Sequence, residues 1–173
     1  MLLRASRLVW FALVALGATA VPARAQAVDP KTAFERMKAL AGTWEGRGGH
    51  GQTDQDVRVV YRVASGGSVV QETQFPGSPH EMISMYHLAD GQLVLTHYCA
   101  MGNQPKMKLD TKASTAERLV FAFDGGTNFD PAKDGHVHSG VLEWKGAGLN
   151  ADWSSWAGGR EQGHILFVLS RQP

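Results

Sequence analysis

From residue 43 onward, the sequence consists of short segments in which apolar and polar residues alternate, separated by turns rich in glycine. This pattern predicts strands over residues 43–48, 57–63, 68–75, 81–88, 93–100, 106–111, 118–123, 136–144, 149–156 and 160–170. Residues 124–135 are the longest irregular stretch and are predicted to form a surface loop. Since this region has no helical period, we expect an all-β protein, an antiparallel up-and-down β-barrel of about ten strands.

A short helix is expected ahead of these strands. Asp29 is a favourable N-cap residue, and Pro30 suits the first helical turn. Apolar residues then recur with helical spacing at positions 33, 34, 37, 40 and 41, and Gly42 is expected to end the helix. The apolar stripe of this helix needs a partner surface, which the open end of a barrel would provide.

The N-terminal segment is expected to direct export. Two arginines precede an uncharged run over residues 8–20, and residues 23–25 read Ala-Arg-Ala. A basic start, an apolar centre and a small-x-small ending form a secretory signal peptide. The run is shorter than the ~20 apolar residues that a membrane-spanning helix needs. We therefore expect residues 1–25 to be cleaved, leaving one barrel domain over residues 26–173 that is periplasmic or secreted and does not span a membrane.

Charge and cysteine content narrow the classes of function. The sequence has 17 basic and 16 acidic residues, and removing residues 1–25 with their three arginines leaves 14 and 16, a net charge of −2. A chain with this charge balance shows no basic patch of the kind that binds nucleic acid. Cys99 is the only cysteine, so an internal disulfide is excluded.

The sharpest turn signal is Asp90-Gly91, which is typical of a two-residue type I′ hairpin. Such a turn sets the register of the flanking strands and places Ser84 opposite His97. Alternation then puts one set of residues on a single, mainly apolar face: Met82, Ser84, Tyr86, Leu95, His97 and Cys99. We predict that this face points inward and lines one wall of a ligand cavity.

Asn103 and Gln104 follow the hairpin, and their side-chain amides can both donate and accept hydrogen bonds. We predict that they lie near the mouth of the cavity; ordinary turn chemistry is the alternative. The polar groups on the inner face are explained by a bound ligand or ordered water. They are equally explained by hydrogen bonds to one another inside a filled core.

The first and the last predicted strands carry a recognisable pattern. Residues 40–48 read Leu-Ala-Gly-Thr-Trp-Glu-Gly-Arg-Gly, and Arg171 follows the last predicted strand. The Gly-x-Trp opening with a basic residue at the far end resembles the calycin superfamily, which includes lipocalins and fatty-acid-binding proteins. The resemblance implies that Trp44 closes one end of the barrel and that Arg171 packs across its ring, as a cation–π contact.

Two further resemblances extend this one. The Gly-Thr-Trp-Glu-Gly-Arg-Gly segment is similar to nitrobindin-like haem-binding barrels, in which a histidine near the C-terminus ligates the iron. His164 is the corresponding candidate here, on a strand where an outward histidine is the commoner case. Residues 96–100, 102–105 and 124–128 make the chain most similar to uncharacterised bacterial secreted proteins of lipocalin-like type, from which no activity transfers.

His136 and His138 suggest a metal site. Their alternation on a strand suits two ligands of one zinc ion, with His50, His80 or His164 as the third. No spacing singles out one of these, and a histidine pair exposed beside a loop is the favoured interpretation.

Two other chemical patterns are weak. His97 and Cys99 lie two apart on one strand, with Cα atoms about 6.8 Å apart, too far for a Cys–His nucleophile. A small buried cysteine and a histidine bonded to a local polar partner such as Ser84 fit better. The acidic residues at 124, 130 and 134 do not match a calcium-binding EF-hand and suit ordinary turns.

These observations favour a binding protein over an enzyme. We expect an exported barrel that binds a small, largely apolar molecule in its interior, without a cofactor and without catalysis. The alternatives are a haem- or zinc-dependent enzyme or redox protein on the same barrel, and an accessory protein that binds a partner through its outer face.

Overall fold

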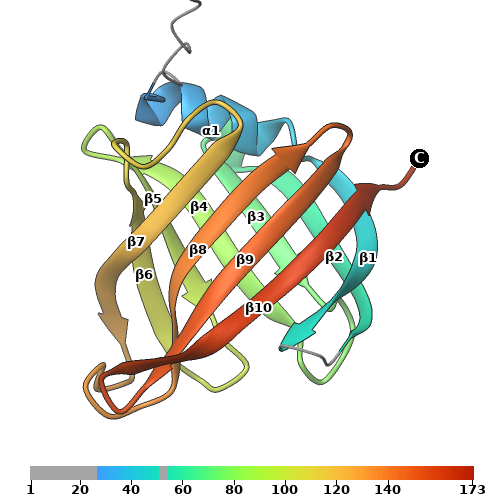
Figure 1. Ribbon diagram of the computed structural model, residues 1–173. Coiled ribbons are helices and arrows are strands. Elements are labelled where there is room, and N and C mark those ends of the chain that lie inside the picture. The colour runs from blue at the N-terminus through green and yellow to red at the C-terminus, as the bar shows by residue number, and fades with distance from the viewer. Residues whose placement is uncertain (1–26, 51–53) are drawn as a thin grey trace, which may run out of the picture.

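The computed structural model describes residues 27–50 and 54–173, which form a closed barrel with a short helix across one end (Figure 1). Each strand pairs antiparallel with its neighbours in sequence, and the last strand pairs with the first. The strands are β1 (Gly42–His50), β2 (Gln55–Ala64), β3 (Val69–Gln74), β4 (Met82–Ala89), β5 (Gln92–Tyr98), β6 (Gln104–Leu109), β7 (Arg118–Thr127), β8 (His136–Lys145), β9 (Gly148–Ala157) and β10 (Arg160–Arg171). The predicted up-and-down β-barrel is therefore confirmed. The predicted cleavage point lies outside the described residues.

The helix α1 (Pro30–Lys38) begins where the sequence predicts. The Asp29 carboxylate accepts hydrogen bonds from the backbone N–H groups of Lys31 and Thr32, at 3.0 and 3.1 Å, and so caps the first turn. The predicted apolar stripe is buried against the barrel, at Ala33, Phe34 and Met37. Of the helices that the structure describes, none is long and apolar enough to cross a membrane.

The helix ends earlier than predicted, at Lys38 rather than just before Gly42. The backbone N–H groups of Leu40 and Ala41 bond to carbonyls three residues back, which tightens the chain after the helix. Gly42 instead opens β1 with a φ of 132°, a conformation that L side chains rarely adopt. A Cβ at this position would lie 3.3 Å from a guanidinium nitrogen of Arg171.

That guanidinium closes the barrel at the α1 end. Its Cζ atom lies 5.0 Å from the centre of the Trp44 ring, the contact expected from the sequence. Arg171 also donates hydrogen bonds to the carbonyl oxygens of Ala41, at 2.8 Å, and Ala39. The indole N–H of Trp44 donates to the carbonyl of Leu40 at 2.8 Å. The first strand, the last strand and the end of the helix are thereby joined.

The β4–β5 hairpin has the predicted register. Asp90 and Gly91 both have positive φ angles, 48° and 77°, as a type I′ turn requires. Tyr86 pairs with Leu95 and Ser84 pairs with His97, and all four side chains are buried. The predicted inward face is therefore correct.

The prediction of an irregular loop over residues 124–135 is wrong for its first four residues. β7 continues to Thr127, and Gln104 and Pro105 of β6 pair with Thr127 and Gly126 across a bulge. The Asp124 carboxylate accepts a bond from Lys108 Nζ at 2.7 Å, side by side on these two strands. The glycines resembled a turn, but pairing with β6 keeps this stretch extended.

Candidate ligand-binding site

The end of the barrel opposite α1 contains a cavity of about 500 Å³. Its walls are mainly apolar and include Phe75, Met82, Met101, Trp153, Ile165 and Phe167. The cavity runs from the surface into the interior, because Met101 is 62% exposed whereas His97 is 1% exposed and Trp153 3%. Its volume lies within the range of about 300–1,000 Å³ typical of small-molecule sites.

His97 stands at the buried end of this cavity, on β5. Its Nδ1 atom lies 3.0 Å from Ser84 Oγ, which confirms the predicted local polar partner. Its ring stacks on Trp153, with 6.2 Å between ring centres and 26° between planes. Burial lowers the pKa of His97 from 6.5 to about 4, so the imidazole is neutral at physiological pH.

Two buried polar atoms of residues that line the cavity have no hydrogen-bond partner among the described residues. They are the Nε2 atom of His97 and the Nε1 atom of Trp153, both fully buried. A buried polar group without a partner costs about 1–3 kcal/mol. A bound molecule or ordered water that met these atoms would remove that cost.

The Trp153 ring occupies space left free by a glycine on the neighbouring strand. Gly140 of β8 pairs with Trp153 of β9. A Cβ on Gly140 would lie 2.7 Å from the Trp153 Cε3 atom, closer than real contacts allow. The absence of a side chain at position 140 therefore makes room for the indole.

A carboxyl group lies deeper in the barrel, at Glu72 on β3, with 0% exposure. Gln74 Nε2 donates to its Oε1 atom at 2.8 Å, and the Tyr86 hydroxyl donates to its Oε2 atom. Burial raises the pKa of Glu72 above its ordinary value, and the two hydrogen bonds act in the opposite direction. The polar groups of the interior thus bond to one another in part, as the filled-core alternative proposed.

Glu72 and Gln74 were not selected from the sequence. The available signal was their alternation with Val70 in a predicted strand, which places all three on one face. Because glutamate is rarely fully buried unless it is paired, that face reads from sequence alone as exposed. The pairing with β4, which carries Tyr86, is what makes burial tolerable.

The residues predicted to line the cavity divide into two groups. Met82, His97 and Cys99 do line it, and the sulfur atoms of Met82 and Cys99 lie 4.0 Å apart. Ser84, Tyr86 and Leu95 share the same inward face but lie deeper, with exposures of 0–1%, outside the lining of the cavity.

Asn103 and Gln104, which were predicted to lie at the mouth, instead form hydrogen bonds with residues in and next to the cavity wall. The Asn103 side chain is buried, and its Nδ2 atom donates to the carbonyl of Gly135, a residue of the cavity wall, at 2.7 Å. Gln104 Oε1 accepts from Thr127 Oγ1 at 3.0 Å and from Asn128 Nδ2 at 2.6 Å. The Asn103 side chain thus links the β5–β6 and β7–β8 connections, whereas Gln104 links the start of β6 to the end of β7 and to the residue after it. Neither residue belongs to the cavity lining.

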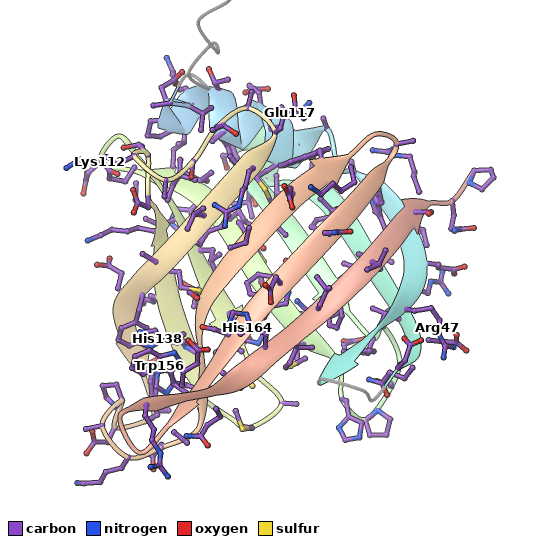
Figure 2. All side chains as sticks on the ribbon, in the orientation of Figure 1. Arg47, Lys112, Glu117, His138, Trp156 and His164 are labelled. Carbon is purple, nitrogen blue, oxygen red and sulfur yellow. The ribbon has the colours of Figure 1, made fainter. Side chains whose placement is uncertain are left out.

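The prediction that His136 and His138 form an exposed pair is wrong. His136 is 1% exposed and His138 is half-buried. A bulge in β8 at this point shifts the register, and His136 Nε2 lies 3.0 Å from His138 Nδ1. His138 stacks on Phe123, with 4.3 Å between ring centres. It also stacks on Trp156, with 3.9 Å between ring centres (Figure 2).

The rings of Phe123, His136, His138 and Trp156 form an aromatic cluster beside the segment in which β7 and β8 are no longer paired. The two strands pair only over Arg118–Phe121 and Gly140–Glu143. Burial, together with the neighbouring His136, lowers the pKa of His138. Across the side chains of residues 27–49 and 54–173, no three of His, Cys, Asp or Glu are grouped so that they could hold a metal ion.

His164 lies on the outer face of β10, where its side chain is 53% exposed (Figure 2). Its Nδ1 atom is 2.9 Å from an Asp152 oxygen and its Nε2 atom 3.1 Å from a Glu161 oxygen. The bond to Asp152 is the main reason why the pKa of His164 is raised. Both ring nitrogens are thus engaged, and the ring lies outside the cavity lining, so this position does not fit a ligand to haem held inside the barrel.

No protein-family profile matches the chain, and no curated protein matches it significantly. The functional interpretation therefore rests on the residues of the cavity and on their geometry.

Proposed function

We propose that this protein is an exported, calycin-like barrel that binds a small, largely apolar molecule in its cavity, without a cofactor and without catalysis. One observation carries the proposal: a cavity of about 500 Å³ has apolar walls and unpaired polar atoms at its buried end. Sites for small molecules combine these features, since apolar walls supply affinity and a few polar groups fix orientation.

The calycin-like assignment is supported by the closed end of the barrel. Trp44 and Arg171 occupy the positions that the resemblance implies, with the guanidinium over the indole. An end closed in this way leaves the opposite end as the entrance for a ligand. The cavity is found at that opposite end.

A binding role is favoured over a catalytic one by the state of the reactive groups near the cavity. Ser84, the hydroxyl bonded to His97, has 0% exposure and no access for a substrate. The same bond occupies the Nδ1 atom of His97, and Cys99 is in contact with the sulfur of Met82. The arrangement therefore lacks an accessible nucleophile activated by this histidine.

The test is a fluorescence titration with N-phenyl-1-naphthylamine, an uncharged apolar probe that emits strongly in apolar surroundings. Cys99→Phe places a ring in the cavity, because Cys99 lines it. Thr96→Phe adds the same ring to β5, the strand that ends just before Cys99, at a position outside the cavity lining, and is the matched control. We expect saturable binding that Cys99→Phe weakens by about tenfold or more and Thr96→Phe by less than about twofold.

Two results would reject the proposal. The first is the absence of saturable binding to the unmodified protein. The second is equal binding by the unmodified protein and by Cys99→Phe, with both folds intact by circular dichroism, since the probe would then occupy another site.

A further inference from the structure

We propose that the cavity selects an uncharged ligand that presents a hydrogen-bond acceptor, such as a ketone, ester or ether oxygen, to His97 and Trp153. This inference rests on the proposed binding function and specifies the chemical class of the ligand. It follows from the charges that the cavity wall lacks and from the donors that it holds.

The cavity wall carries no formal charge from an acidic or strongly basic residue. Among the described residues that line it, none is Asp, Glu, Lys or Arg. The nearest carboxyl group identified in the interior, Glu72, is already bonded to Gln74 and Tyr86. A carboxylate or ammonium group on a ligand would therefore lose its hydration without gaining an ionic partner, which strongly disfavours charged molecules.

The histidines of the wall do not replace the missing cations. Burial keeps His97 neutral, with a pKa of about 4. His136 has its Nδ1 atom 2.9 Å from the carbonyl of Asp134 and its Nε2 atom 3.0 Å from His138 Nδ1, so both ring nitrogens already bond within the protein and are not available to a ligand. His80 is exposed at the rim, where water would screen any charge.

The Ser84 hydroxyl lies 3.0 Å from His97 Nδ1, and the tautomer of the imidazole decides which of the two groups donates. If the hydroxyl donates to Nδ1, both groups are satisfied, and the ring proton then resides on Nε2. We take this tautomer, in which the unpaired Nε2 atom of His97 is a donor.

Trp153 supplies the second donor, since an indole N–H can only donate. Its Nε1 atom is buried and, like His97 Nε2, unpaired within the described residues. The two rings stack with 6.2 Å between centres, and both residues line the cavity. The two lone pairs of a ligand oxygen could each accept one of these bonds, whereas a purely hydrocarbon ligand would leave both donors unpaired.

The experiment compares three ligands of similar size by equilibrium dialysis at neutral pH: 2-ethylnaphthalene, 2-acetylnaphthalene and 2-naphthoate. The ethyl compound is purely apolar, the acetyl compound carries an uncharged hydrogen-bond acceptor, and the naphthoate carries an anionic acceptor. We expect 2-acetylnaphthalene to bind about tenfold more tightly than 2-ethylnaphthalene, because it satisfies a buried donor. We expect 2-naphthoate to bind at least about tenfold more weakly than 2-acetylnaphthalene.

Variants then assign the preference to the donors. Trp153→Phe and His97→Phe each remove one N–H while keeping an aromatic ring, and each should reduce the preference for the acetyl over the ethyl compound. Trp144→Phe, a tryptophan next to Arg36 at the α1 end, is the matched control and should retain the preference. If His97→Phe does not fold, Trp153→Phe alone decides the role of the donors.

The outcomes separate the two proposals. If all three compounds bind equally well, the cavity binds small molecules but the inferred selectivity is wrong. The inferred selectivity is also wrong if the acetyl preference survives in the folded Trp153→Phe variant. If none of the three compounds binds saturably, the binding function itself is rejected together with the selectivity.

Discussion

The guanidinium carbon of Arg171 lies 5.0 Å from the centre of the Trp44 ring, and the same side chain bonds to the carbonyls of Ala39 and Ala41. These contacts join the last strand to the first strand and to the segment that follows α1. The closure of the barrel at this end therefore depends on residues that are far apart in the sequence.

Arg171→Ala should destabilise the protein by about 1 kcal/mol, through loss of the cation–π contact and of stem packing. Arg171 is exposed, so solvent limits the loss. The free energy of unfolding, measured by urea denaturation, tests the prediction. Arg171→Lys is the control and should retain part of the stability, and an unchanged midpoint in Arg171→Ala would show that the contact contributes nothing.

His97 should make stability fall as the pH falls. Its pKa is about 4 in the folded protein against 6.5 when unperturbed, so the unfolded chain takes up this proton first on acidification. The contribution of neutral His97 to the free energy of unfolding is therefore fully present above about pH 6.5. It is lost as the pH falls from there to about pH 4, a change of about 3 kcal/mol.

The non-titrating variant His97→Gln isolates this effect. Unfolding free energies of both proteins are measured from about pH 7 to about pH 4, and that of the unmodified protein should fall by about 3 kcal/mol relative to that of His97→Gln. Glu72, whose pKa is shifted upward, is present in both proteins, so its opposite contribution cancels in the comparison. Parallel pH profiles would contradict the prediction.

Gly140→Ala should displace the Trp153 indole, because the added Cβ would lie 2.7 Å from Cε3. We expect a loss of about 1–3 kcal/mol in stability, weaker binding of N-phenyl-1-naphthylamine and a changed tryptophan emission. A second substitution, Trp153→Phe, removes much of the overlap. The double variant should therefore be more stable than the sum of the two single losses predicts, and strict additivity would reject the proposed overlap.

His164→Ala should leave binding of N-phenyl-1-naphthylamine unchanged, because this ring lies on the outer face with carboxylate partners. Haem titration followed by absorbance provides the complementary measurement. A sharp Soret band that appears with the unmodified protein and disappears in His164→Ala would favour the haem alternative over the proposed function.

The predicted export and cleavage are tested by the mass of the exported protein. The segment ending in Ala-Arg-Ala predicts that the mature protein begins at Gln26. The intact mass of protein recovered from the periplasm or medium should correspond to residues 26–173. A mature protein that retains Met1 would contradict the prediction, and Ala25→Arg, which disrupts the small-x-small pattern, should block processing.

The sequence predicted those features that depend on local geometry. The Asp90-Gly91 turn determines which residues pair across it, and this led directly to Ser84 opposite His97. Strand positions were predictable for the same reason, because alternation and turn residues act over a few neighbouring positions. The cap at Asp29 belongs to this class too.

The features that sequence reasoning missed depend on partners distant in the chain. Glu72 is buried because a neighbouring strand supplies Tyr86, and alternation alone cannot reveal that partner. The bulge in β8 brings His136 against His138 and buries it, whereas a regular strand would not set the two rings in this way. Trp153, on β9, reaches the same cavity as His97 on β5 only once the barrel closes.

The most direct measurement is a crystal structure of the mature protein with N-phenyl-1-naphthylamine. The binding proposal predicts density for the probe within the cavity between Phe75, Trp153 and Ile165, at the end of the barrel opposite α1. Density for the probe on the outer face, or a cavity closed by its own side chains while the probe still binds in solution, would contradict the proposed function.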